Sequence, residues 1–181
     1  ELRNIDKWIL SEMDKLVVLA DDSYNKYDFH VPATKIKHFL WETLASHYLE
    51  LAKKRVYDDA NLFSEEEKNG AVYTLNTVLQ TLLKLWAPVI PVLTYKVYRD
   101  LYNDDIHFLE YPTQTGITSE LTKADVEELN GFIWKHKKDN GISLKDPIKK
   151  LTMPEKYKSI EKDISIMHNI PEIIYGELKI E

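Results

Sequence analysis

The stretch FLWETLASHYLELAKKRVYDD, residues 39–59, sets the fold of the chain. It contains neither glycine nor proline, and its apolar residues recur three and four positions apart, as on a helix face that packs against a core. The same spacing extends back to Val31, so we expect one long helix from about Val31 to Tyr57. Its apolar stripe consists of Ile36, Leu40, Leu44, Tyr48, Leu51, Ala52 and Val56.

Helical periodicity also runs through the rest of the first 140 residues. Further helices are expected over about residues 6–24, 64–86, 91–102 and 118–140. Asp6 is placed to cap the first of these, and Ser64 with Glu67 has the spacing of a capping box. In the helix that follows Pro91, the spacing places Leu93, Val97 and Leu101 toward the interior.

The last forty residues have a different pattern. The segments PIKKLTM (147–153) and EIIYGELKI (172–180) predict strands, and PEKYKSIEKDISIMHN (154–169) between them predicts a helix. A crossover of this kind allows the two strands to pair in parallel. The sequence therefore predicts a mainly α protein, with an antiparallel helical bundle over residues 1–140 and a small strand–helix–strand subdomain over residues 141–181.

The composition argues against several classes of active site. The 181-residue chain has no cysteine, which removes disulfides, thiolate nucleophiles and cysteine-bound zinc. It contains no Gly-x-Ser-x-Gly elbow, no glycine-rich phosphate loop and no paired Glu-x-x-His of a di-iron bundle. We therefore expect no catalytic residue and no metal site, and six histidines that serve as surface or packing residues. The net charge of −6 argues against nonspecific coating of DNA.

Two basic clusters interrupt this acidic chain. Lys53, Lys54 and Arg55 end the long helix, and Glu50 lies four residues before Lys54, at a spacing that allows an ion pair. Residues 135–150 contain six lysines and two aspartates, a local charge of +4. Either cluster can hold the phosphates of a nucleic acid or can be a solvated surface, and cations at a helix C-terminus also complement its dipole.

Aromatic residues are the second feature of an RNA-binding surface, because unstacked bases pack on them. Three of the four tryptophans, Trp8, Trp86 and Trp134, occupy positions expected in the core. Trp41 lies at the edge of the apolar stripe. It is the one tryptophan whose position favours base stacking.

Residues 39–59 resemble the second-helix signature of the anticodon-binding domain of class I aminoacyl-tRNA synthetases for branched aliphatic amino acids. Three further segments agree with this family in the right order. They are LRNIDKWILSEMDKLV (2–17), AVYTLNTVLQTLLKLWAPVIPVLTYKVYRDLY (71–102) and DDIHFLEYP (104–112). A weaker resemblance continues through residues 132–154.

Within this family, the pattern Tyr48-x-Glu50-x-x-Lys53-x-Arg55 is most similar to the valyl-tRNA synthetases, with the isoleucyl and leucyl enzymes next. One departure is the pair Tyr95–Lys96, which stands where members of the family often carry acids. We expect this difference to change the surface charge of a helix rather than the fold.

The resemblance implies that the bundle binds the anticodon stem and loop of a tRNA. Polar and aromatic groups near the second helix would read base edges, and lysine and arginine side chains would hold phosphates. The candidate RNA contacts are His38, Trp41, Glu42, Lys53, Lys54 and Arg55, with Lys135, Lys137 and Lys138 as secondary candidates. Arg55 also lies beside the apolar stripe, so it is equally suited to be a buried tether to a neighbouring helix.

The two catalytic signatures of the family, His-Ile-Gly-His and Lys-Met-Ser-Lys-Ser, do not occur in these residues, and there is no initiating methionine. The resemblance then implies a fragment that needs no cofactor itself. Its parent would join valine to tRNA(Val), using ATP and Mg²⁺ in a catalytic domain of the same chain. We expect a cytoplasmic monomer without a membrane partner. The alternative is a helical protein-docking or scaffold domain that makes no RNA contact.

Overall fold

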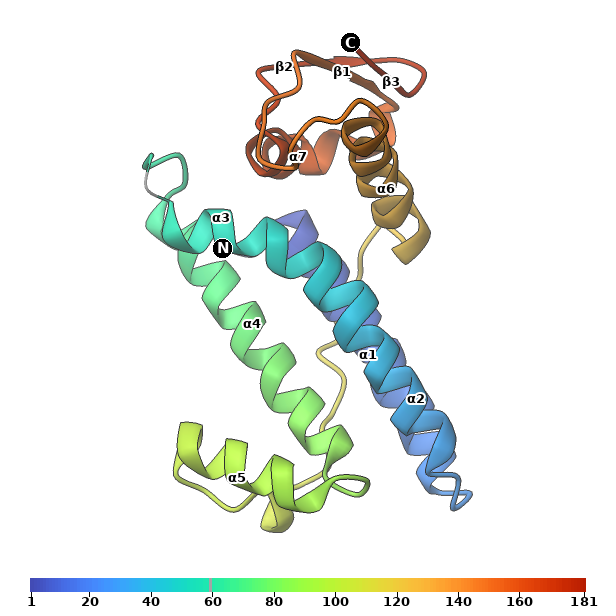
Figure 1. Ribbon diagram of the computed structural model, residues 1–181. Coiled ribbons are helices and arrows are strands. Elements are labelled where there is room, and N and C mark those ends of the chain that lie inside the picture. Colours follow the sequence, from blue (N-terminus) through green and yellow to red (C-terminus); the bar gives the residue numbers. More distant parts are fainter. Residues whose placement is uncertain (59) are drawn as a thin grey trace.

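The computed structural model describes residues 1–58 and 60–181; Asp59, in the stretch quoted first, lies outside the described residues. The chain is mainly helical with a small sheet, which confirms the expected fold class (Figure 1). The helices are α1 (Asn4–Tyr24), α2 (His30–His38), η1 (Phe39–Tyr48), α3 (Leu49–Tyr57), α4 (Glu65–Trp86), α5 (Pro91–Tyr102), η2 (Ile106–Phe108), α6 (Lys123–Asp139), η3 (Glu155–Ile160) and α7 (Glu161–His168). The strands are β1 (Lys150–Met153), β2 (Glu172–Tyr175) and β3 (Lys179–Ile180).

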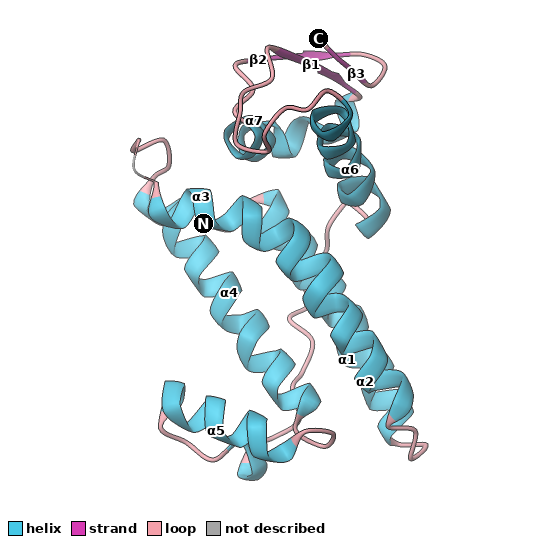
Figure 2. Cartoon of the chain, in the orientation of Figure 1, coloured by secondary structure: helices cyan, strands magenta, loops and turns pink. Residues whose placement is uncertain are grey.

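The bundle is built on α1, which packs along α2 and η1 and also contacts α4. Helix α4 then leads to α5, which lies across the end of the bundle away from the sheet (Figure 2). A continuous apolar core joins the bundle to the C-terminal part, because Trp8 of α1, Leu129 of α6 and Leu151 of β1 belong to one buried cluster. Among the residues that the structure describes, no helix combines the length and apolar character needed to cross a bilayer.

The long helix expected over residues 31–57 forms without a break, but its middle is not α-helical. Segment η1 is a π-helix, in which backbone hydrogen bonds reach five residues back instead of four. The hydroxyl of Ser46 adds a bond to the carbonyl oxygen of Trp41 across the same five-residue step, at 2.8 Å. The wider turn shifts the side chains that follow it, and His47, outside the predicted apolar stripe, is buried.

The helix starts show how local sequence sets the ends of the elements. Ser64 and Glu67 form the predicted capping box at the start of α4, with bonds of 2.9 and 3.2 Å. In α1 the cap position belongs to Arg3 rather than to Asp6. Asp6 is the third helical residue, where its carboxylate accepts the backbone N–H of Arg3 at 2.9 Å. Helix α6 begins at Lys123, five residues later than expected, after a capping box that starts at Thr122.

The predicted interior face of α5 is wrong at Leu93 and Leu101, whereas Val97 packs against a buried cluster as expected. Leu93 and Leu101 are 59% and 56% exposed, whereas Thr94 and Tyr98 are buried. The turn after Trp86 sets the rotation of α5 about its axis, and the hydroxyl of Thr94 bonds back to the carbonyl of Ile90 at 3.1 Å. The buried face is therefore displaced by one residue from the one that apolar spacing suggests.

The C-terminal part contains the predicted strand–helix–strand unit. Strands β1 and β2 pair in parallel, with Leu151 opposite Ile173, and η3 and α7 form the crossover between them. The short strand β3 adds an antiparallel partner on the other edge, so the strand order is β2-β1-β3. The predicted boundary between domains at residues 140 and 141 stays a prediction.

Candidate nucleic-acid interface

The outer side of the long helix carries the first three candidates. His38, Trp41 and Glu42 are all exposed, and residue Trp41 is 62% exposed. The imidazole Nδ1 of His38 lies 2.9 Å from a carboxylate oxygen of Glu42, one helical turn away. This hydrogen bond to His38 lowers the pKa of Glu42. The three side chains thus offer a flat aromatic surface next to a hydrogen-bonding pair.

A groove of about 340 Å³ lies beside these residues. We call it the α1–α2 groove; its lining residues are Glu12, Lys15, Leu16, Leu19, Lys35, His38, Phe39, Glu42, Thr43 and Lys123. Lys15 is paired with Glu12 at 2.6 Å, and Lys123 lies 3.4 Å from Glu127. Lys35 has no ion-pair partner among the described residues, so its charge is available to an anion in the groove.

Lys53 and Lys54 lie on the surface of α3, on the same long helix. Glu50 pairs with Lys53, three residues away, and not with Lys54 as the spacing suggested. Both lysines line a cavity of about 410 Å³ that also includes Tyr57 of α3 and Asn169 after α7. The structure therefore leaves Lys54 as an exposed cation at this end of the helix.

Arg55 has no access to the surface, so its place among the RNA contacts is wrong. Its side chain is fully buried and forms an ion pair with the equally buried carboxylate of Asp6, with one guanidinium bond of 2.9 Å. The hydroxyl of Tyr48 donates to the same carboxylate at 2.6 Å. Arg55 is thus the tether between α3 and α1, which was the second of its two predicted roles.

The secondary RNA-contact candidates in α6 also divide into exposed and buried lysines. Lys135 and Lys138 are exposed, but Lys137 is buried and cannot contact RNA. The ammonium group of Lys137 donates to three backbone carbonyl oxygens, those of Leu144, Asp146 and His168, at 2.9, 2.7 and 3.1 Å. Burial lowers the pKa of Lys137. Its role is to fix the loop after α6 and the end of α7.

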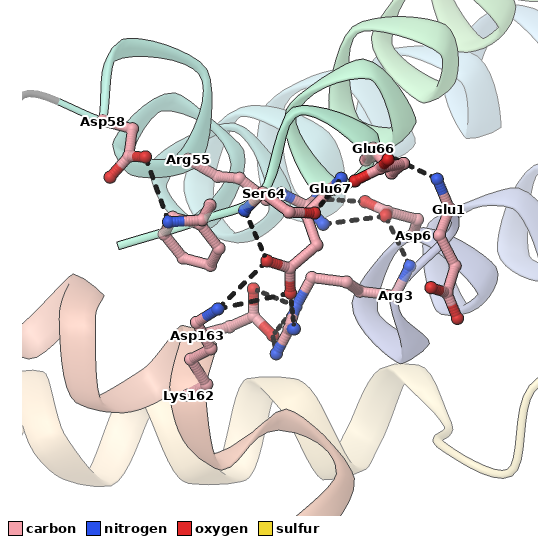
Figure 3. Close-up of polar contacts among 11 residues, drawn as sticks. Glu1, Arg3, Asp6, Arg55, Asp58, Ser64, Glu66, Glu67, Lys162 and Asp163 are labelled. Carbon is pink, nitrogen blue, oxygen red and sulfur yellow. Dashed lines mark hydrogen bonds and ion pairs between the residues drawn. The ribbon is translucent and has the colours of Figure 1, made fainter. Parts of the chain in front are cut away.

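A polar network that sequence reasoning missed joins the bundle to the C-terminal part (Figure 3). Arg3 donates two bonds to one carboxylate oxygen of Asp163 in α7, at 3.0 and 2.9 Å, and also pairs with Glu67 at the start of α4. Lys162 reaches Glu67 at 3.1 Å. Partial burial acts to raise the pKa of Glu67, but the N–H of Ser64 and the two cations outweigh it and lower the pKa to about 2.

A second feature that sequence reasoning missed is a pair of buried histidines, His47 and His168, joined by the side chain of Asn130. The amide of Asn130 in α6 lies 3.1 Å from Nδ1 of His47 and, through its oxygen, 3.0 Å from Nε2 of His168. Burial lowers the pKa of both rings, to about 3 for His168. The histidines are packing residues that connect η1, α6 and α7. Within the described parts of the chain, no cluster of three or more acidic or histidine side chains is arranged to hold a metal ion.

Comparison with known proteins matches residues 6–152 to the family model described as the anticodon-binding domain of tRNA ligase. Among individual relatives, a valine–tRNA ligase of Pyrobaculum aerophilum is 30% identical over 97% of the chain. The valine–tRNA ligase of Ehrlichia canis is 34% identical over 94% of the chain, and that of Thermococcus kodakarensis is 32% identical over 100% of the chain. In each case the chain spans 22% of the relative's length. The matched segment includes the whole long helix, and the chain belongs to the family of anticodon-binding domains of tRNA ligases.

Proposed function

We propose that this chain recognises the anticodon stem-loop of a tRNA, and that its cognate is tRNA(Val). The observation that carries the proposal is the exposed Trp41, next in sequence to Glu42, whose pair with His38 lines the α1–α2 groove within the family-matched segment. The names of the relatives support valine as the amino acid, because all three are valine–tRNA ligases.

The residues have the chemistry that a single-stranded loop requires. An unstacked base packs on the face of Trp41, since every base has a flat aromatic surface. The carboxylate of Glu42 and the imidazole of His38 accept and donate hydrogen bonds at base edges. Lys35 and Lys54 hold phosphates, which adds affinity without sequence preference.

The π-helical segment supports this role. Trp41 and Glu42 both lie in η1, and stretches of π-helix are rare and often found at functional sites. The widened turn exposes Trp41 while the opposite side of the same segment buries His47 and Tyr48. One segment thus anchors the helix to the core and presents an aromatic side chain to solvent.

The ligase reaction belongs to the parent protein in this proposal. The parent joins valine to tRNA(Val) with ATP and Mg²⁺ in a catalytic domain of the same polypeptide, in the cytoplasm and as a monomer. The residues described here bind and orient the RNA and take no part in the bond-forming step.

Replacing Trp41 with alanine is expected to weaken stem-loop binding by about tenfold without lowering the melting temperature, because base–aromatic stacking contributes roughly 1–3 kcal/mol and the side chain is largely exposed. Fluorescence anisotropy with a labelled anticodon stem-loop and a thermal scan measure the two quantities. The matched control is Phe108→Ala, an aromatic residue that is 88% exposed on η2 and does not line the α1–α2 groove. Unchanged affinity in Trp41→Ala, or equal loss in both variants, contradicts a stacking role.

One observation favours the alternative, a protein-docking domain. Four apolar residues are exposed on α5 and η2, namely Val92, Leu93, Leu101 and Phe108. Titration of the chain with the stem-loop at low and high salt separates the two functions. Phosphate contacts require binding that weakens steeply as salt rises, and base reading requires a preference over a scrambled loop. A chain that binds no RNA at low salt would be assigned to docking.

A further inference from the structure

A second groove lies between the end of α6 and the segment that follows it. Its volume is about 820 Å³, and it is lined by Trp134, Lys135, Lys138, Asp139, Ile142, Ser143 and Leu144. We call it the α6 groove. The ring of Trp134 stacks on His47 with centroids 5.2 Å apart, and Leu144 is 59% exposed. The groove therefore combines an indole and two aliphatic side chains with two ammonium groups.

The wall of this groove is fixed by hydrogen bonds. The buried ammonium of Lys137 holds the carbonyl oxygens of Leu144 and Asp146, and the N–H of Ile142 donates to the carbonyl of Lys137 at 2.8 Å. The loop is thus held in place by the end of α6. A ligand would meet a largely preformed surface and would not have to order a flexible segment when it binds.

The positive charges of this region are only partly compensated by the acids that the structure describes nearby. Lys135, Lys138 and Lys145 are exposed and take part in no ion pair among the described residues, whereas lysines elsewhere, such as Lys96 and Lys156, are paired with acids. Asp139 is the one acid among the described lining residues. The charge of the groove therefore favours an anionic ligand.

Helix α6 connects this groove with the α1–α2 groove. Lys123, which lines the first, and Trp134 and Lys138, which line the second, fall within about 60° of each other around α6 at 3.6 residues per turn. Along the helix axis the two sets are separated by about 20 Å at ~1.5 Å per residue. A stacked nucleic-acid strand covers this distance in about six nucleotides at ~3.4 Å per step.

We propose that the α6 groove holds an unstacked nucleotide of the same tRNA whose anticodon loop contacts the α1–α2 groove. The base packs against Trp134 and Leu144, and its flanking phosphates contact Lys135 and Lys138. The inference rests on the proposed function and extends it, because it assigns a second subsite on a different element. An acidic peptide would also meet the lysines, but one polyanion running along α6 reaches both Lys123 and Lys138, which lie within about 60° of each other around the helix.

A substitution pair tests the subsite. Leu144→Glu introduces a carboxylate into the groove and is expected to weaken binding of an anticodon stem-loop by about tenfold, as loss of one stacked base does. Leu101→Glu is the matched control, because Leu101 on α5 is 56% exposed and lines neither groove. Its affinity is expected to stay at the wild-type value, and both variants should keep the wild-type melting temperature. Lys138→Ala should reduce the slope of log affinity against log salt by about one.

Photocrosslinking locates the contact. A photoactivatable thiouridine is placed in turn at each unpaired position of the stem-loop, and crosslinked tryptic peptides are identified by mass spectrometry. One position is expected to crosslink to residues 124–135 or 139–145.

If the wild-type chain binds the RNA but Leu144→Glu binds as tightly as Leu101→Glu, the subsite is overturned while the proposed function stands. If the wild-type chain binds no RNA, both fail. Binding of a poly-glutamate peptide alone, weakened by Leu144→Glu, would assign the groove to a protein partner.

Discussion

Replacing Arg55 with leucine is expected to lower the free energy of unfolding by about 3 to 5 kcal/mol, because the carboxylate of Asp6 is left buried without its counter-charge. Tyr48 and the N–H of Arg3 still donate to that carboxylate, but neither is a cation. Urea unfolding followed by far-UV circular dichroism measures the change. RNA binding at a temperature where the variant is folded should be preserved, since Arg55 does not reach the surface.

Two companion variants make this expectation specific. Lys54→Leu, the same kind of change at the neighbouring exposed residue, should leave stability almost unchanged. Asp6→Asn combined with Arg55→Leu should recover part of the loss, because the double variant no longer buries a charge. If Arg55→Leu were as stable as Lys54→Leu, Arg55 would not be the tether of α3 to α1.

Acidification from pH 7 to pH 5 is expected to cost about 2 kcal/mol of stability through His168 alone. Burial, and then the charge of Lys137, lowers the pKa of His168 in the folded protein from 6.5 to about 3. Below pH 6.5 the unfolded chain binds a proton that the folded chain does not accept until the pH approaches 3. Stability is therefore complete above pH 6.5 and falls as the pH drops through this window. His47, whose pKa is also lowered by burial, acts in the same direction, with Glu127 opposing the shift and Lys123 adding to it.

A glutamine at position 168 isolates this effect. His168→Gln keeps an N–H that can donate to Asn130 but has no proton to gain, so its loss of stability between pH 7 and pH 5 should be about 2 kcal/mol smaller than that of the wild-type chain. His30→Gln, at an exposed histidine, is the control and should follow the wild type. The comparison is made at pH 5 and above, because a second loss of stability begins at lower pH. Glu67 and Asp125 have pKa values lowered to about 2, so their contributions to stability are lost as the pH falls below about 4.5. Equal losses in the wild type and in His168→Gln would show that this ring does not control acid stability.

Much of the fold follows from local pattern. Spacings of three and four predict where α1, α4 and the long helix lie, and the Ser64–Glu67 box predicts the start of α4 to the residue. The parallel pairing of β1 and β2 follows from the helix between them. These features depend on residues close together in sequence, which is why periodicity and capping rules reach them. The rotation of α5 depends instead on how the turn after Trp86 positions the helix on α4, and apolar spacing does not contain that information.

The candidate site was predicted less completely, and the two errors have one cause. Arg55 and Lys137 are cations in basic clusters, and a basic cluster in a sequence predicts exposed side chains, whereas both residues are buried. Each side chain has a partner from a distant segment: Asp6 lies 49 residues from Arg55, and the carbonyl of His168 lies 31 residues from Lys137, although the other two partners of Lys137 are only 7 and 9 residues away. The one available signal was the position of Arg55 beside the apolar stripe, which raised the tether as an alternative. Nothing comparable marked Lys137 or the Arg3–Asp163 pair.

The three carbonyls around Lys137 have a mechanical consequence. The loop after α6 and the last turn of α7 share one ammonium group as a hydrogen-bond donor, so neither can swing away without leaving that cation short of an acceptor. A fluctuation that opens one of them must strain the other as well. The wall of the α6 groove and the C-terminal end of α7 are therefore expected to move together, because both are bonded to the buried Lys137.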